Sequence, residues 1–290
     1  AMLNYQIANA GPLYYADTWV IGSTSGIETI IDGSTPIKSG TTGIADNTFR
    51  GCTKLSNVAI PNTVKYIGDS AFENCGELAI ITIPSSVESI GGYAFSNCSR
   101  LTTMDIPNNV KNMGNGVFYN CTKLSEIKLS TSLGAIGISA FEGCKLLTAV
   151  DIPASVASIG DKAFYGCSGL NTITINNAKC EIYDSGNTIN KTPITICGAK
   201  GSTAESYATK YNKTFKEVSS SGVKGDANGD GVLRASDAAF IAKKLAEASI
   251  SGSKVTITAY PNADFNGDGK ITAADAAAIA KYLAEQSIKK

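Results

Sequence analysis

Apolar residues recur through most of the chain at one fixed spacing. A phenylalanine returns at every twenty-third position from Phe49 to Phe164, and a cysteine and a leucine follow it at constant offsets. A unit of this length cannot bury its apolar residues alone, so successive units must stack and share one core. The pattern therefore predicts a solenoid of about seven coils. The three columns are Phe49, Phe72, Phe95, Phe118, Phe141 and Phe164; Cys52, Cys75, Cys98, Cys121, Cys144 and Cys167; and Leu55, Leu78, Leu101, Leu124, Leu147 and Leu170.

Within each unit, an alternation of apolar and polar residues predicts one half-buried strand. In residues 101–106 we expect Met104 and Ile106 to point inward and Asp105 outward. Equivalent strands of successive coils would then form a parallel sheet. A proline follows this strand in several copies, and it should end the strand because it lacks the N–H that the ladder needs next. These prolines are Pro61, Pro84, Pro107 and Pro153.

One glycine per unit follows a second apolar stretch of the form Val-x-x-Ile. We expect it to form a tight or positive-φ corner of the coil, since glycine tolerates both close approach and a left-handed backbone. The glycines in this column are Gly68, Gly91, Gly114, Gly137 and Gly160.

These motifs resemble leucine-rich repeats of the surface-antigen or Treponema type, which occur in many bacterial surface and secreted proteins. The resemblance spans roughly residues 27–186 and rests on the period, the cysteine, and the Leu-x-x-Ile-x-Ile-Pro and Ile-Gly-x-x-Ala-Phe signatures. Some copies differ: Ser130 and Asn176 replace proline, and Leu129 and Met113 replace isoleucine. The resemblance implies a β-rich leucine-rich repeat solenoid with a parallel sheet.

Both ends of such an array need a cap, because an end coil has a neighbour on one side only. Residues 3–26 are expected to cover the first coil. At the other end, residues 202–205 read Ser-Thr-Ala-Glu, a capping-box pattern that predicts a short helix over the last coil. The aromatic residues of the first cap are Tyr14, Tyr15 and Trp19. The covering face of the helix is Ala204, Tyr207, Ala208 and Tyr211.

The six cysteines of the repeat are expected to be free thiols. Adjacent coils would place them about 5 Å apart, within disulfide range. A small thiol that fills the same buried niche in every coil nevertheless explains the column better. Cys180 and Cys197 lie outside the column, and the sequence leaves open whether they pair. Cysteine usage therefore does not fix the redox compartment.

The repeat pattern ends at a short polar stretch, residues 219–223, which has the composition of a flexible linker. The sequence thus predicts two domains. Residues 1–218 form the repeats with their caps, and residues 224–290 form a second, smaller domain.

Two stretches of the smaller domain, which begin at Asp226 and Asp264, have the spacing of a twelve-residue calcium-binding loop. In such a loop, positions one, three, five and twelve offer side-chain oxygens, position six is a glycine, and position seven offers a backbone carbonyl. The predicted ligands are Asp226, Asn228, Asp230, Val232 and Asp237 in the first loop, and Asp264, Asn266, Asp268, Lys270 and Asp275 in the second.

The same residues would also form Asx turns without a metal. Clustered carboxylates repel one another without a cation, however, so the sequence favours two Ca²⁺ ions that also drive folding of the domain. Mg²⁺ is less suitable because it demands tighter octahedral geometry. Chelation should therefore unfold this domain.

A run of strong helix formers follows each loop, at residues 238–247 and 276–285. Neither loop has a clear amphipathic helix before it, and position twelve is Asp instead of the Glu of an EF-hand. This duplicated loop-helix unit closely resembles a type I dockerin, the calcium-binding tag that attaches components to the cohesin modules of cellulosomal scaffoldins. The resemblance covers about residues 225–290. It implies a small all-α module with a scaffoldin cohesin as partner.

In that family, cohesin contacts residues at the end of each loop and along each helix. The matching positions are Ala235, Ser236, Ala242, Lys243 and Glu247, and in the second copy Ala273, Ala274, Ala280, Lys281 and Glu285. The two sets are nearly the same, so either helix could face the partner. The best-known members carry paired hydroxyls where this chain has 235–236 and 273–274, which leaves the cohesin specificity open. Lys243 and Lys281 either contact acidic residues at the edge of the cohesin surface or are merely solvated.

Composition removes several function classes. The chain has 290 residues, with 25 basic and 25 acidic side chains, which argues against a nucleic-acid binder or a polybasic anchor. It has no histidine, which removes Ser-His-Asp and Cys-His catalysis and histidine-containing zinc sites. No apolar stretch approaches the roughly 20 residues that span a bilayer, and residues 1–5 carry no signal-peptide pattern.

The outward strand positions of the repeat are small and mostly uncharged. Coplanar aromatic rings, which usually serve polysaccharide docking, are missing from this register, so binding of a protein is favoured, although a surface without any ligand stays open. The positions are Asn57, Ile80, Thr103, Glu126, Ala149 and Thr172, and Ala59, Thr82, Asp105, Lys128, Asp151 and Thr174.

Three function hypotheses follow. The first is a non-catalytic, secreted component of a polysaccharide-degrading cellulosome, in which the dockerin anchors the chain and the repeats bind a protein or surface. The second is a cell-surface adhesin. The third, least supported, is a carboxylate-based glycosidase, since Asp105 and Asp151 would stand two coils or about 10 Å apart and exposed. Extracellular location follows from the dockerin resemblance alone.

Overall fold

The computed structural model describes residues 7–10, 13–23, 37–218, 225–227, 233–251, 254–256, 260 and 262–288. The chain divides into two compact units, Ala1–Lys216 and Glu217–Lys290. The predicted linker, residues 219–223, lies outside the described residues. The predicted domain bounds therefore stay predictions.

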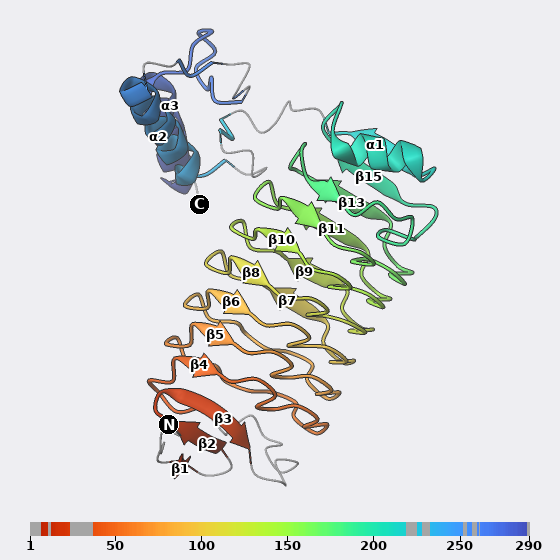
Figure 1. The fold of residues 1–290 in the computed structure, drawn as a ribbon. Helices are drawn as coiled ribbons and strands as arrows, with labels where there is room; N and C mark the ends of the chain where they lie inside the picture. The colour runs from red at the N-terminus through yellow and green to blue at the C-terminus, as the bar shows by residue number, and fades with distance from the viewer. Residues whose placement is uncertain are drawn as a thin grey trace. The chain divides into compact units, whose positions relative to one another are not determined.

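The first unit is a β-solenoid, as predicted (Figure 1). One column of its short parallel strands comes from the Val-x-x-Ile-Gly stretch, which the sequence did not mark as strand. Partners along this column are one repeat period apart, and within the described residues the ladder is interrupted only between β8 and β10. We call its outer surface the Ile-Gly face. Its strands are β4 (Gly43–Ile44), β5 (Tyr66–Ile67), β6 (Ser89–Ile90), β8 (Asn112–Met113), β10 (Ala135–Ile136), β12 (Ser158–Ile159) and β14 (Glu181–Ile182).

A second column comes from the predicted Leu-x-x-apolar-x-Ile stretch, and we call its outer surface the Ile-Pro face. The predicted alternation is confirmed, because Met104 and Ile106 are buried whereas Asp105 is exposed. Segments 57–60 and 80–83 were expected to be strands but form none in the described chain, although Val58 and Ile81 are still buried in the core. The strands are β7 (Thr103–Asp105), β9 (Glu126–Lys128), β11 (Ala149–Ile152), β13 (Thr172–Ile175) and β15 (Thr195–Gly198), with β16 (Thr214–Glu217) beside β15.

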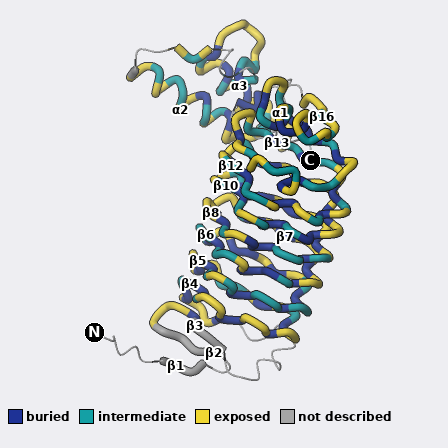
Figure 2. The backbone as a smooth tube through the Cα atoms, turned by 45° about the vertical axis from the view of Figure 1, so that its right-hand side comes forward, coloured by how far each residue is buried: buried dark blue, intermediate teal, exposed yellow. Residues whose placement is uncertain are grey.

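The core between the columns repeats one similar layer per coil. Figure 2 shows buried segments recurring along the solenoid. Rings of the phenylalanine column lie nearly parallel, from 5.0 Å between the centroids of Phe49 and Phe72 to 5.7 Å between those of Phe95 and Phe118. Each coil thus buries the same ring against the same neighbour. This repetition explains why the period never slips.

The cysteines are free and buried, as expected for the repeat column. The thiol of Cys75 donates a hydrogen bond to the Phe49 carbonyl at 3.1 Å, and each later member of the column repeats this contact at 3.0–3.2 Å. The thiol therefore satisfies a buried carbonyl of the preceding coil. Cys180 and Cys197 are also free thiols here.

Of the two alternatives expected for the corner glycines, a tight corner or a positive φ, the structure shows the tight corner. The glycines of the Gly68 column have no positive φ, and those angles fall instead at positions such as Ser70 and Tyr93. The glycine is needed for close approach, because a Cβ on Gly91 would lie 2.5 Å from the backbone nitrogen of Asp69. The prolines do begin a turn, in which Val87 N–H donates to the Pro84 carbonyl at 3.0 Å.

Caps close both ends of this unit. At the N-terminus, β1 (Ile7–Ala10), β2 (Leu13–Ala16) and β3 (Trp19–Ser23) form an antiparallel meander, and β3 pairs in parallel with β4. At the other end, α1 (Thr203–Lys210) begins at the predicted cap, where Ser202 Oγ accepts from the Glu205 N–H at 3.3 Å. The buried Tyr207 donates to the Ser185 carbonyl at 2.7 Å and accepts from the Ile189 N–H at 3.1 Å.

The second unit contains the two predicted helices, α2 (Ala235–Ser251) and α3 (Ala273–Ile288). Its small core includes Ile241 of α2 and Ile279 of α3, which are 1% and 0% exposed, together with Ile271 from the second loop. No helix in the described part of the chain is both long and apolar enough to cross a membrane.

Candidate functional site

The second predicted calcium loop, residues 264–275, is described in full and is folded around its first aspartate. Asp264 Oδ1 accepts from the N–H groups of Gly267 and Asp268 at 2.7 and 3.1 Å. Its Oδ2 accepts from Gly269 at 2.9 Å. Gly269 holds position six and has a φ of +84°, a left-handed turn that favours glycine.

The last position of each loop is fixed in the same way. Asp275 is fully buried, and its carboxylate accepts from the N–H groups of Asn266 at 3.1 Å and Thr272 at 2.8 Å. In the first loop, Asp237 is equally buried and accepts from the Arg234 N–H at 2.7 Å. Asp226 is also buried, whereas Asn228, Asp230 and Val232 lie outside the described residues.

The donor chemistry of these loops fits Ca²⁺. Asp264, Asp268 and Asp275 supply carboxylates, Asn266 supplies an amide oxygen and Lys270 supplies a carbonyl, all of them hard oxygen ligands. Within the described residues, no three acidic or cysteine side chains are gathered into a closed metal-binding cluster. The backbone of the second loop turns at Gly267 and Gly269, which both have a positive φ, and its carboxylates accept hydrogen bonds from backbone N–H groups.

All ten residues predicted to contact cohesin are exposed. On α2, Ala242 and Lys243 share an exposed surface with Glu247, whose carboxylate lies 3.9 Å from the Lys243 ammonium. On α3, Ala280 and Lys281 hold the same positions and are also exposed. The remaining members, Ala235, Ser236, Ala273, Ala274 and Glu285, are exposed at or along the same two helices.

The two helix surfaces differ at one position that the sequence reading left out. Lys244 of α2 pairs with Glu247 at 2.7 Å, and this bond raises the pKa of Lys244 and lowers the pKa of Glu247. The equivalent residue on α3 is Tyr282, which is 42% exposed and packs its ring edge-on against Phe265. The exposed surfaces of α2 and α3 therefore differ in chemistry at Lys244 and Tyr282.

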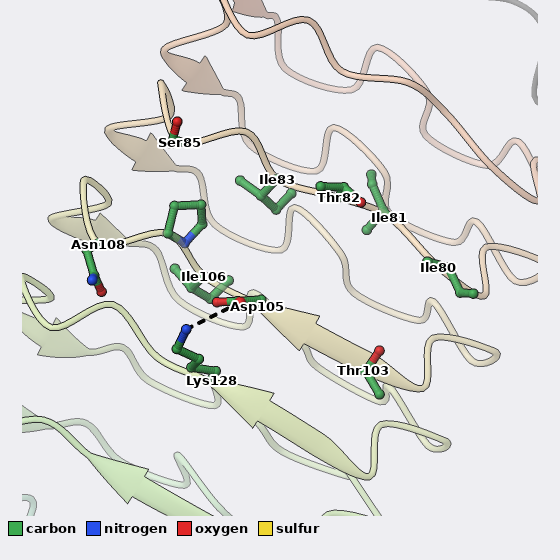
Figure 3. A pocket seen from close by; sticks show the side chains of 11 residues that line it. Ile80, Ile81, Thr82, Ile83, Ser85, Thr103, Asp105, Ile106, Asn108 and Lys128 are labelled. Carbon is green, nitrogen blue, oxygen red and sulfur yellow. Dashed lines mark hydrogen bonds and ion pairs between the residues drawn. The ribbon is translucent and has the colours of Figure 1, made fainter. Parts of the chain in front are cut away.

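The Ile-Pro face carries a shallow hollow of about 400 Å³ where segment 80–83 meets β7 (Figure 3). Ile80 is 64% exposed at its rim, and Asp105 and Lys128 form an ion pair of 3.5 Å across it. The predicted outward positions are exposed, except that Thr172 and Thr174 are half-buried. An exposed ion pair of this kind contributes little stability.

The contacts of Asp105 and Asp151 give no support for the catalytic carboxylate pair of a glycosidase. Asp105 is held by Lys128, and Asp151 Oδ1 accepts a hydrogen bond of 2.7 Å from the Asn176 amide. Both aspartates are exposed on the solenoid surface. Neither sits in the enclosed, apolar environment of a general acid.

Two sequence families match the chain. The family described as BspA type leucine rich repeat region matches residues 33–147 in six copies. The family described as dockerin type I domain matches residues 224–284. Both are families of non-catalytic interaction modules, and both are typical of extracellular or surface proteins. No curated protein matches the chain.

Solved structures of bacterial leucine-rich repeat proteins are similar to the first unit. A leucine-rich repeat protein of T. pallidum shares its fold and is 22% identical, with a TM-score of 0.52, over 73% of this chain and 95% of that protein. A leucine-rich repeat protein of Bacteroides ovatus ATCC 8483 is 19% identical, with a TM-score of 0.45, over 74% of this chain and 75% of that protein.

Proposed function

Because the chain consists of a BspA-type leucine-rich repeat solenoid followed by a type I dockerin, we propose that it is a secreted, non-catalytic component of a cellulosome. Its dockerin binds a scaffoldin cohesin in a calcium-dependent way. Its repeats hold a protein or a surface close to the complex.

The observation that carries this proposal is the duplicated loop-helix unit with its matching exposed residues. Each helix begins at the last residues of its loop. The buried Asp237 or Asp275 lies in the first turn of the helix and accepts a hydrogen bond from a backbone N–H of the loop. When bound, two Ca²⁺ ions would neutralise the carboxylates of the two loops. Asp226, Asn228, Asp230, Val232 and Asp237 would hold one ion, and Asp264, Asn266, Asp268, Lys270 and Asp275 the other.

Calcium dependence follows from this coupling. The loop residues set the direction of the first turn of each helix, so a loop without its cation would not present Ala242 or Ala280 correctly. Cohesin is therefore expected to bind only the calcium-loaded chain.

The test is calorimetric titration of the full chain with a panel of cohesins, in calcium and again in EDTA. We expect tight binding to at least one cohesin in calcium and none in EDTA. Binding that persists in EDTA would contradict the calcium dependence. Failure with every cohesin, despite calcium-dependent folding, would remove the assignment of the contact residues.

Variants on one helix at a time test whether both surfaces bind. Ala242→Asp places a charge on the α2 surface, and Ala280→Asp places the matched charge on α3. If either surface suffices, each single variant keeps binding and the double variant loses it. A complete loss in one single variant would show that only that helix faces cohesin.

A further inference from the structure

Two aromatic side chains lie together on the Ile-Gly face near its N-terminal end, and a third follows in the next coil. Trp19 of β3, Tyr66 of β5 and Tyr93, which follows β6, are 37%, 42% and 45% exposed. The rings of Trp19 and Tyr66 lie 6.0 Å apart between centroids and only 3° from parallel. Their strands belong to one continuous sheet, so these two rings face the same direction.

Glycines in the neighbouring coils make room for these rings. A Cβ on Gly43 would lie 2.5 to 2.6 Å from three atoms of the Trp19 six-membered ring. A Cβ on Gly116 would lie 2.3 Å from the Tyr93 ring. Trp19 and Tyr93 therefore each lie over the glycine of the next coil.

Beyond the rings, the face continues with small uncharged residues. The outward positions of β6, β8, β10 and β12 are Ser89, Asn112, Ala135 and Ser158. They lead to a second hollow of about 430 Å³, lined in part by Ile138 and Tyr183, which are 50% and 55% exposed. The first charged residue on this line is Glu181 of β14. Charged residues flank the line at Asp69, Lys111 and Asp161, and at Lys65 and Glu88, whose charged groups lie 3.7 Å apart.

This combination matches the chemistry of a neutral sugar chain. A pyranose ring has an apolar C–H face, which stacks on the electron-rich face of an aromatic ring, and hydroxyls at its edge, which bond to small polar side chains. Strand spacing of about 4.8 Å per coil turns the face into a straight track along the solenoid. The outward strand positions from Trp19 to Ser158 are uncharged, which suits a neutral chain better than a charged one.

We propose that the Ile-Gly face binds a neutral linear polysaccharide along the solenoid axis, with Trp19 and Tyr66 as its stacking platform. This site is separate from the Ile-Pro face, whose register lacks aromatic rings. It is independent of cohesin binding, because it belongs to the first unit alone.

The test is affinity electrophoresis of the full chain in gels that contain mixed-linkage β-glucan or xylan, and pull-down on insoluble cellulose. Polygalacturonate serves as the charged comparison. We expect retention by at least one neutral polysaccharide and at least about tenfold weaker binding by Trp19→Ala and Tyr66→Ala. Thermal melting of each variant checks that the solenoid is folded.

Tyr165→Ala is the matched control, since Tyr165 is 39% exposed but lies beside Phe164, between β12 and β13. It should bind as the parent does. Gly43→Ala should weaken binding without removing any aromatic ring, because its methyl group displaces Trp19. No retention by any neutral polysaccharide, equal loss in Tyr165→Ala, or capture of only a protein by this face would overturn the proposal.

Discussion

At the scale of single residues, the corner glycine has the strictest role in the solenoid. The sequence revealed its period but not its reason, since a recurring glycine is consistent with both a positive φ and a close contact. The geometry at Gly91 shows a close contact, because a Cβ there would meet the backbone of the adjacent coil and φ is not positive. A local pattern cannot report which atoms of two successive coils come close to each other.

Replacing this glycine should separate two coils. In Gly91→Ala the new methyl group would lie 2.5 Å from the Asp69 nitrogen, so we expect a loss of about 1–3 kcal/mol in the free energy of unfolding. Gly134→Ala is the matched control, because its methyl group meets only the Lys111 carbonyl at 3.7 Å. Urea unfolding of both variants measures the difference, and equal stability would refute the close-contact explanation.

At the scale of elements, the sequence predicted the strand that alternates most clearly and missed its partner column. Residues 103–105 alternate over a stretch long enough to be recognised. The strands of the Ile-Gly face have two residues each, as in β5, and their period-two signal is too short to read. Their parallel ladder depends on stacking of coils, which only the whole repeat provides.

The C-terminal cap depends on one buried hydroxyl. Tyr207→Phe removes the acceptor of the buried Ile189 N–H and one of two donors to the Ser185 carbonyl, which still accepts from the Thr188 N–H at 3.1 Å. We expect a loss of about 1–3 kcal/mol in unfolding free energy. Tyr211→Phe is the comparison, because its hydroxyl bonds to the exposed Asp184 at 2.7 Å. An equal effect of both changes, measured by denaturant unfolding, would argue against this role.

At the scale of the whole molecule, the two units depend on different chemistry. The sequence made this division visible, since every cysteine lies before residue 198 and both loop motifs lie after residue 225. The sequence also predicted the spacing of the calcium ligands and the helix that follows each loop. The aromatic platform escaped notice because Trp19 and Tyr66 belong to different coils and meet only across a glycine of the intervening coil.

Calcium and alkaline pH should therefore act on separate transitions in scanning calorimetry. Burial, followed by the charge of Glu181, raises the pKa of Cys180 to about 11, and burial raises that of Cys167 to about 12. The same burial raises the pKa of Cys98 and of the other inner thiols. Unfolded thiols ionise near pH 9, so their stabilising contribution is complete below pH 9 and is lost as pH rises toward the folded values.

Raising the pH from 8 to 10 should lower the solenoid transition by more than about 5 °C, because each of these thiols with a raised pKa loses up to about 1.4 kcal/mol of stabilisation per pH unit above 9. The dockerin contains no cysteine, so its transition serves as the internal control at alkaline pH. EDTA at pH 7.5 should do the reverse, lowering or abolishing the dockerin transition and leaving the solenoid transition in place. A solenoid transition that moves with EDTA, or that stays fixed between pH 8 and 10, would contradict this separation of the two units.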